Sequence, residues 1–343
     1  MAVKEEIMSF INTINGYLST KKEDNRNVYS TKINSFATFL QEEKNVTDKN
    51  YMEYLSALKM DVILESLGYF IRNNQINKKS VAYFYGRTLK RYFQYLGEIG
   101  IENENLRKIF AYTNKNSKSY DNQIKHYIEN HSELKNVETK DAIDFEDAKF
   151  LAAEIDEQIA ENLQKPEVMT CTESRLNPYN SLINLLALKL ILFTGIDYNG
   201  LITLSSNCLD NKKIKITINS YTLHLPDKLG EQLIEYEKIK NKRQLSGETF
   251  FVPSNRKIMK TQTSDVSYII EQTLGRGDIT GIRKYVITEL IRNGVNQSFI
   301  MKLTGAGQTL FTDCQNTVNK ERHIEANRYI DSKMRNMMMF DYL

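Results

Sequence analysis

The chain of 343 residues contains no tryptophan, and it is poor in residues that interrupt helices, with only 4 prolines and 15 glycines. Because proline and glycine are the strongest breaks in regular structure, their scarcity favours long helices. The apolar runs fall short of the ~18–20 residues of a membrane span, and the N-terminal sequence lacks the apolar region of a signal peptide. We therefore expect a helical, cytoplasmic protein that has no membrane partner.

Cysteine and histidine are also scarce. Cys171, Cys208 and Cys314 are far apart in the sequence, and the four histidines form no HxxxH or HExxH pair. A disulfide framework usually needs an even number of cysteines. A zinc site usually needs Cys or His ligands at close spacing. The sequence therefore predicts reduced thiols and neither a metal site nor a cofactor.

The net charge of only +3 says little about binding partners, but the charges are unevenly distributed. Residues 1–112 carry 16 Lys and Arg against 13 Asp and Glu, and residues 166–343 carry 23 against 18. The stretch between them, 113–165, carries 7 against 12. Two basic blocks around an acidic connector are expected if both blocks face a polyanion. Random scatter of charge is the alternative interpretation.

The N-terminal part shows apolar residues at helical spacing in four successive segments, which predicts a compact helical bundle. These segments are residues 25–40, 51–58, 63–73 and 80–96. A polar stretch follows, which we interpret as a linker with a short helix near residues 123–130. The predicted organisation is an N-terminal domain at 1–112, a linker at 113–140 and a C-terminal domain at 141–343.

The C-terminal part mixes helical and strand patterns. An amphipathic helix is predicted from about Asp144, and the nearly all-apolar run 181–196 predicts a buried central helix. Residues 212–226 then alternate around Asn219 and Ser220, which is typical of a β-hairpin, and 248–253 predicts a third strand. Helical patterns resume from residue 266 to the C-terminus. The predicted fold class is mainly α with a small antiparallel sheet.

Two segments resemble the tyrosine recombinase (phage integrase) family. TGIRKYVITELIRNGVNQSFIMKLTGAG, residues 280–307, is similar to the family's HxLRHTFAT…LxxG…IxxxLGH pattern, and LILFTGIDYNGLITL, residues 190–204, is similar to LLLxTGLRxSELxxL. The resemblance implies a C-shaped two-domain clamp around double-stranded DNA. Its N-terminal part would be a helical, SAM-like core-binding domain, and its C-terminal part an integrase-catalytic-like domain.

The same resemblance implies that the chemistry is lost. In the family, a tyrosine attacks a phosphodiester while arginines and a His or Trp hold the phosphate and a hairpin lysine handles protons. Here Asp197 stands at the position of the first arginine, Thr280 and Ala306 stand at histidine positions, and Gln315 stands at that of the tyrosine. The lysine expected near the hairpin turn is also missing. Only Arg283 remains, so we expect a catalytically inactive member.

A protein that keeps this fold without the chemistry is expected to bind DNA, as a sequence-specific transcriptional regulator. The resemblance extends to the repressors of SP-beta-type prophages. The candidate DNA contacts are basic residues on the fourth helix of the first domain, around the hairpin and third strand, and in the second matching segment. They are Lys78, Lys79, Arg87, Lys90, Arg91, Lys242, Arg243, Arg256, Lys257, Lys260, Arg283 and Lys284. For each of them, a solvated surface charge is the alternative.

Two other functions stay open. One is a divergent active recombinase that cuts and joins DNA through a displaced tyrosine such as Tyr329. The other is an accessory protein that binds its partner through the Met-rich segment 319–343. That segment predicts an amphipathic helix that binds a second copy of the chain or folds back on its own. A protein antirepressor or co-regulator is a further expected partner, and the expected location is the bacterial cytoplasm, at the nucleoid when DNA is bound.

Overall fold

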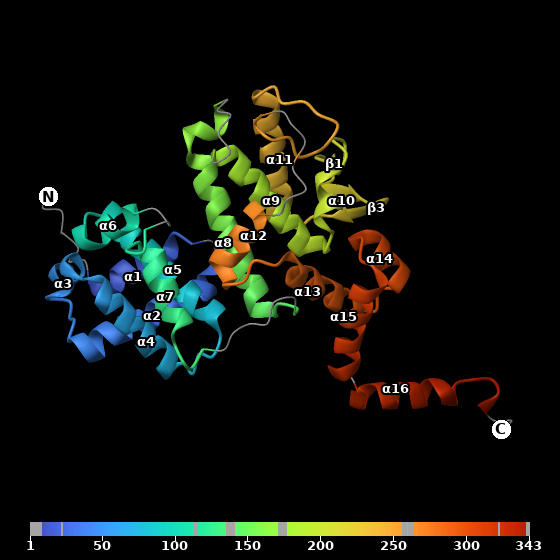
Figure 1. Cartoon of the computed structure of the whole chain (residues 1–343), viewed down its shortest axis with the longest axis horizontal. Coiled ribbons are helices and arrows are strands. Elements are labelled where there is room, and N and C mark those ends of the chain that lie inside the picture. Colours follow the sequence, from blue (N-terminus) through green and yellow to red (C-terminus); the bar gives the residue numbers. More distant parts are fainter. Residues whose placement is uncertain are drawn as a thin grey trace, which may run out of the picture. The chain divides into compact units, whose positions relative to one another are not determined.

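The computed structural model describes residues 9–21, 23–112, 116–134, 141–170, 177–255, 259, 264–321 and 323–340. Within them the chain is mainly helical, with helices α1 to α16 and one small antiparallel sheet (Figure 1). The predicted fold class is therefore confirmed. The chain divides into two compact units. The first comprises Met1–Glu138, Lys149–Glu154 and Ile270–Gly277, and the second comprises Thr139–Ala148, Ile155–Ile269 and Asp278–Leu343.

The first unit is a bundle around α5. Its helices are α1 (Phe10–Ser19), α2 (Glu23–Lys44), α3 (Tyr51–Ala57), α4 (Met60–Asn73), α5 (Lys79–Glu98), α6 (Glu104–Ala111) and α7 (Tyr120–Glu129). Helix α5 presents Leu89, Tyr92 and Leu96 to the core, where all three are fully buried. Their spacing of three and four residues places them on one helix face, as the periodicity predicts.

Several tyrosines pack in this core with their hydroxyls hydrogen-bonded. The Tyr92 ring packs edge-on against Tyr17, with ring centroids 5.5 Å apart. Its hydroxyl is paired with the Thr13 hydroxyl at 2.7 Å. The buried Tyr120 hydroxyl donates to the Gly86 carbonyl at 2.7 Å. A buried phenol needs such a partner, because an unpaired hydroxyl in an apolar core is costly. Burial also raises the pKa of Tyr92, so its hydroxyl stays protonated.

The short helix expected near residues 123–130 of the linker is present as α7, but it packs into the core of the first unit instead of linking two domains. Helix α7 buries Tyr120, Ile124 and Ile128 in the same core as α5, and Leu134 joins them. These residues recur every four positions, which gives one apolar helix face within a polar sequence. The polar composition concealed that face, so the predicted boundary at residue 112 is replaced by one near residue 138.

The second unit is built around α9 (Pro178–Thr194). The other helices are α8 (Phe145–Gln164), α10 (Tyr198–Ile202), α11 (Asp227–Lys242), α12 (Ser264–Leu274), α13 (Ile279–Arg292), α14 (Gln297–Thr304), α15 (Gln308–Glu321) and α16 (His323–Arg335). Parts of α8 and α12 belong to the first unit. Helix α9 is buried on all sides, as its apolar run predicts. Among the described helices, none is long and apolar enough to cross a membrane.

The sheet has the strand order β1–β2–β3, and all its pairs are antiparallel. The strands are β1 (Leu209–Asp210), β2 (Lys215–Ile218) and β3 (Tyr221–His224). The predicted hairpin is confirmed, with Ile218 opposite Tyr221 on either side of the turn. The third strand predicted at 248–253 is wrong, because this segment makes only an isolated bridge from Thr249 to Ser205. The short β1 takes its place in the sheet.

A buried amide fastens the corner between α3 and α4. The Asn103 side chain donates to the carbonyls of Leu55, at 2.6 Å, and Leu58, at 2.8 Å. Its oxygen accepts the Leu106 N–H at the start of α6. One side chain therefore satisfies three backbone groups, two of which would be buried without a partner if it were removed.

We expect Asn103→Ala to lower the free energy of unfolding by ~3 kcal/mol, because it removes a helix cap and leaves two buried carbonyls without donors. Urea unfolding measures the change. The matched control is Asn105→Ala, which removes one exposed bond to the Ala57 carbonyl and should cost less than ~0.5 kcal/mol. Equal losses in the two variants would contradict the assigned role of Asn103.

Candidate nucleic-acid interface

Two of the positions that the sequence singled out, Asp197 and Arg283, meet at one place in the second unit. Asp197 follows the end of α9, and its backbone N–H donates to the Thr304 carbonyl at the end of α14, at 2.9 Å. The Arg283 side chain extends from α13 to both of these helix ends. The Asn219 amide at the hairpin turn donates to the Leu303 carbonyl at 2.9 Å. The segments 190–204 and 280–307 therefore come together in the second unit.

Arg283 binds backbone oxygens at this site. Its Nε donates to the Gly195 carbonyl at 3.2 Å, and its Nη2 donates to the Thr304 carbonyl at 3.0 Å. Helices α9 and α14 both end in a left-handed glycine, Gly195 with φ 69° and Gly305 with φ 67°. A cation is favourable at a helix C-terminus, where carbonyls lack intrahelical partners. The guanidinium therefore ties two helix ends together.

Asp197 places a carboxylate beside this arginine. Its Oδ1 accepts the Gly200 N–H at 2.6 Å and caps α10. A Cβ at position 305 would lie 3.0 Å from the Asp197 Oδ2, so the carboxylate packs closely against the end of α14, where the φ of 67° favours glycine. Burial lowers the pKa of Arg283, and the nearby Asp197 charge works in the opposite direction. The site thus contains its own counter-charge, which disfavours an incoming phosphate.

The remaining positions offer little reactivity. Ala306 is buried and apolar, Thr280 lies half-buried in the first turn of α13, and Gln315 donates to Asn319 on its own helix. The Cys314 thiol is buried and lies 3.7 Å from the Lys284 carbonyl. Burial raises the pKa of Cys314, which keeps the thiol protonated and poorly nucleophilic at neutral pH.

The hairpin turn is short and carries no lysine. Asn219 and Ser220 have φ of 47° and 72°, as a two-residue turn of type I′ requires. Lys215 pairs with His224 at the end of the hairpin far from the turn. Lys302 on α14 is exposed and lies over the Tyr221 ring, with Nζ 5.3 Å from the centroid. Sequence reasoning missed Lys302, because only the hairpin packing brings it to the site.

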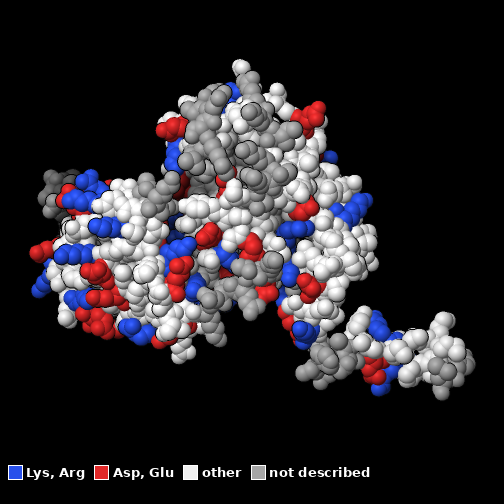
Figure 2. All heavy atoms as spheres, in the orientation of Figure 1, with Lys and Arg blue, Asp and Glu red and all other residues white. Residues whose placement is uncertain are grey.

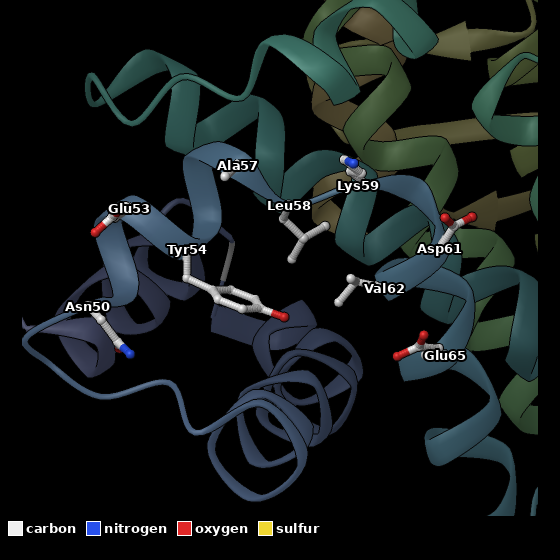
Figure 3. A pocket seen from close by; sticks show the side chains of 9 residues that line it. All are labelled: Asn50, Glu53, Tyr54, Ala57, Leu58, Lys59, Asp61, Val62 and Glu65. Carbon is white, nitrogen blue, oxygen red and sulfur yellow. The ribbon is translucent and has the colours of Figure 1, made fainter.

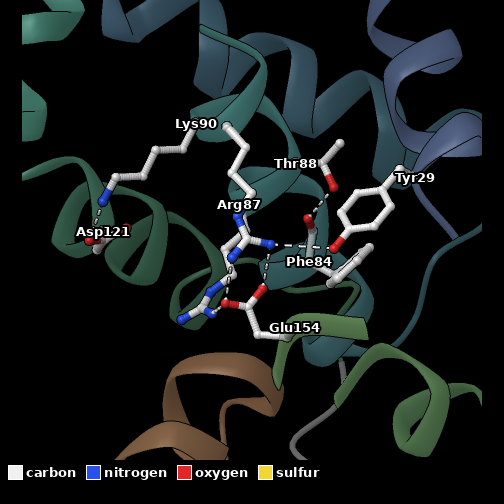
Figure 4. A network of polar contacts seen from close by, with 8 residues as sticks. Tyr29, Phe84, Arg87, Thr88, Lys90, Asp121 and Glu154 are labelled. Atoms are coloured by element: carbon white, nitrogen blue, oxygen red, sulfur yellow. Dashed lines mark hydrogen bonds and ion pairs between the residues drawn. The ribbon is translucent and has the colours of Figure 1, made fainter. Parts of the chain in front are cut away.

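The basic stripe predicted on α5 is used inside the first unit (Figure 4). Arg87 Nη1 lies 2.7 Å from Glu154 Oε1, and Arg91 Nη1 lies 3.0 Å from Glu154 Oε2. The Glu154 side chain is only 2% exposed. Lys90 pairs with Asp121 at 2.7 Å. These three cations therefore have carboxylate partners, which corrects the picture of a free basic face.

The acidic connector supplies these partners. Glu154 and Asp121 both lie in the stretch 113–165, whose excess of acidic residues stood out in the sequence. In the second unit, Asp156 of the same stretch pairs with Lys189 at 2.6 Å and also with Lys228. Figure 2 shows Lys and Arg interspersed with Asp and Glu on the face drawn. Acidic residues of the connector thus pair in the folded protein with cations from the basic blocks.

The other predicted contacts differ in exposure. Lys242 is exposed at the end of α11, and Lys78 and Lys79 are half-buried where α5 begins. Arg243 is buried, with its guanidinium 4.1 Å from the Tyr179 ring centroid and Nη1 donating to the Val168 carbonyl. Lys284 pairs with Asp313 at 3.3 Å. Three further candidates, Arg256, Lys257 and Lys260, lie outside the described residues.

The structure offers no site for a metal among the residues it describes. No group of three or more His, Cys, Asp or Glu side chains is close enough together to hold an ion there. Cys208 and Cys314 are both buried and free.

We expect Arg283→Met to lower the free energy of unfolding by ~3 kcal/mol, since it keeps an apolar stem but removes two charged hydrogen bonds to helix-end carbonyls. Urea unfolding measures the change. Arg107→Met is the control, because the exposed Arg107 pairs with Glu104 on its own helix and its loss should lower the free energy of unfolding by less than ~0.5 kcal/mol. An Arg283→Met variant as stable as this control would show that the bonds from Arg283 to the Gly195 and Thr304 carbonyls do not stabilise the fold.

No protein-family model and no curated protein sequence matches the chain. Among solved structures it is similar to the XerA recombinase, at 14% identity and a TM-score of 0.37, over 90% of this chain and 98% of that chain. It is similar to the XerH recombinase bound to a palindromic difH substrate, at 15% identity and a TM-score of 0.39, over 90% of this chain and 79% of that chain. It is also similar to lambda integrase residues 75–356, a dimer bound to a COC' core site. The identity is 15% and the TM-score 0.28, over 90% of this chain and 95% of that chain. Values this low do not by themselves assign the chain to a family.

Proposed function

We propose that this chain binds double-stranded DNA without cutting it, and that it does so on a catalytically inactive tyrosine-recombinase fold. One observation carries the proposal: Arg283 bonds to the carbonyls of Gly195 and Thr304, and Asp197 lies beside it. The two sequence segments that resemble the family meet there. The convergence therefore supports the resemblance, and the chemistry of the residues speaks against cleavage.

Cleavage of a phosphodiester needs cationic donors aimed at the developing charge and a nucleophile in line with it. Removing one such donor typically costs ~10²–10³ in rate. In this site the surviving arginine is engaged with the backbone, and an aspartate stands where the family has a second arginine. Gln315 cannot act as a nucleophile. These differences act on the same transition state, so we infer an inert site.

DNA binding needs less than cleavage does, because phosphate contacts require only accessible cations. The proposed contacts are Lys78, Lys79, Lys242, Lys302, Arg256, Lys257 and Lys260. We assign Arg87, Lys90, Arg91, Arg243 and Lys284 structural roles instead, since each already has a carboxylate or carbonyl partner within its unit. Arg283 acts as a tie between helix ends that keeps the surrounding surface in place.

A protein that binds DNA and does not cut it suits transcriptional regulation. We propose a sequence-specific repressor similar to those of SP-beta-type prophages, acting in the bacterial cytoplasm at the nucleoid. Helix α16 and the residues after it expose several large apolar side chains, a surface that fits a second copy of the chain or a protein antirepressor. They are Tyr329, Ile330, Met334, Met337, Met338, Met339 and Phe340.

The second candidate function is a divergent recombinase. One observation favours it: Tyr329 on α16 is 64% exposed, so its hydroxyl is accessible to a partner or to DNA. It would still act without the histidine and the second arginine that the family uses.

We expect the purified chain to bind particular fragments of its own genome, with an affinity that falls steeply as salt rises. Lys302→Gln should weaken binding to all fragments alike and lower the slope of log K against log salt by about 1, since it removes one phosphate contact. Fluorescence anisotropy across a salt series measures both. Lys108→Gln is the control, because Lys108 is exposed but pairs with Glu104 on its own helix. Salt-independent binding, or no fragment bound, would overturn the proposal.

On a nicked suicide substrate carrying a bound sequence, we expect no covalent protein–DNA adduct, because the site lacks a nucleophile and its cationic partners. Denaturing electrophoresis detects an adduct. Tyr329→Phe distinguishes the two functions. An adduct that forms with the parent chain and disappears in this variant would establish the recombinase and sink the inactive-fold proposal.

A further inference from the structure

The corner between α3 and α4 forms an open surface hollow of about 580 Å³ that the DNA-binding proposal does not use (Figure 3). Its apolar lining comes from Tyr54 and Ala57 of α3, Leu58 at the corner and Val62 of α4. Figure 3 shows the Tyr54 ring and the Val62 side chain pointing toward each other across it. A volume of this size is in the range of ligand sites, which are ~300–1,000 Å³.

Carboxylates surround this apolar lining. Glu53 lies on the α3 side, and Asp61 and Glu65 lie on the α4 side (Figure 3). Lys59 is the lining cation. Glu65 pairs with Lys44, but within the part of the chain that the structure describes no ion pair is made by Glu53 or Asp61. The hollow therefore offers negative charge on both sides of an apolar centre.

The corner that shapes the hollow is held in place before anything binds. Asn103 donates to the carbonyls of Leu55 and Leu58, and Leu55 itself is fully buried. A preformed site loses little conformational entropy on binding, which favours affinity. The hollow is therefore a built feature of the first unit.

From this charge and shape we propose that the hollow is the docking site for a basic segment of a partner protein, in which a large apolar side chain is flanked by Lys or Arg. The apolar side chain fills the space between Tyr54 and Val62, and the flanking cations face Glu53 on one side and Asp61 on the other. The carboxylates of Glu53 and Asp61 favour a cationic polypeptide over DNA or an anionic membrane as the partner. The inference does not depend on DNA binding.

The test is titration of the full chain with a short synthetic peptide in which two leucines are flanked by lysines, without DNA, followed by calorimetry. We expect saturable one-to-one binding. The double variant Glu53→Gln with Asp61→Asn should weaken it roughly tenfold, since each charge pair contributes modestly. Val62→Arg should abolish it, because the arginine fills the hollow. Replacing the leucines of the peptide with serines should also abolish binding.

The matched control is Glu98→Gln with Glu102→Gln, which removes two exposed carboxylates of the same unit outside the hollow. It should bind the peptide as the parent chain does, and thermal unfolding confirms that each variant folds. Equal weakening in the control and the hollow variants would show general charge attraction and overturn the proposal. Absence of saturable binding would also overturn it. Self-association of the chain that Val62→Arg removes would assign the hollow to a second copy instead.

Discussion

The second unit depends on the guanidinium of Arg283, which joins the C-terminal ends of α9 and α14 through the carbonyls of Gly195 and Thr304. Helix ends leave carbonyls without intrahelical donors, and a buried end needs them satisfied. An arginine can do this with two donors from one rigid group. The recombinase resemblance gives this arginine a phosphate to hold, so its use as a structural tie is consistent with the proposed loss of cleavage.

The first unit shows the same principle with side-chain carboxylates. Glu154 forms ion pairs with Arg87 and Arg91, and Asp121 forms one with Lys90, so these cations of α5 hold the bundle together. A buried carboxylate between two arginines is tolerable only because both of its oxygens are paired. In the proposed function, affinity for DNA then comes from the cations that folding leaves accessible, such as Lys242 and Lys302. The acidic hollow at the α3–α4 corner adds a surface suited to a different kind of partner.

Much of the fold could be predicted because local patterns carry it. The apolar run of α9, the alternation of β2 and β3 and the two-residue turn at Asn219 are all local, and each was found. Helix α7 was missed as part of the bundle, because its apolar face consists of only three buried residues within a polar stretch. The strand predicted at 248–253 is wrong, because its backbone groups bond to the loop around Leu204 and Ser205.

For the site, the sequence by itself determined which residue types are available: an aspartate, a threonine, an alanine and a glutamine at four positions where the family has catalytic groups, with one arginine left. That segments 190–204 and 280–307 belong to one site was implied only by their resemblance to the recombinase family. Only the tertiary structure decided where each charge goes. The partners of Arg283, Arg87 and Arg91 lie tens of residues away along the chain, and no local pattern encodes a contact that exists only after packing.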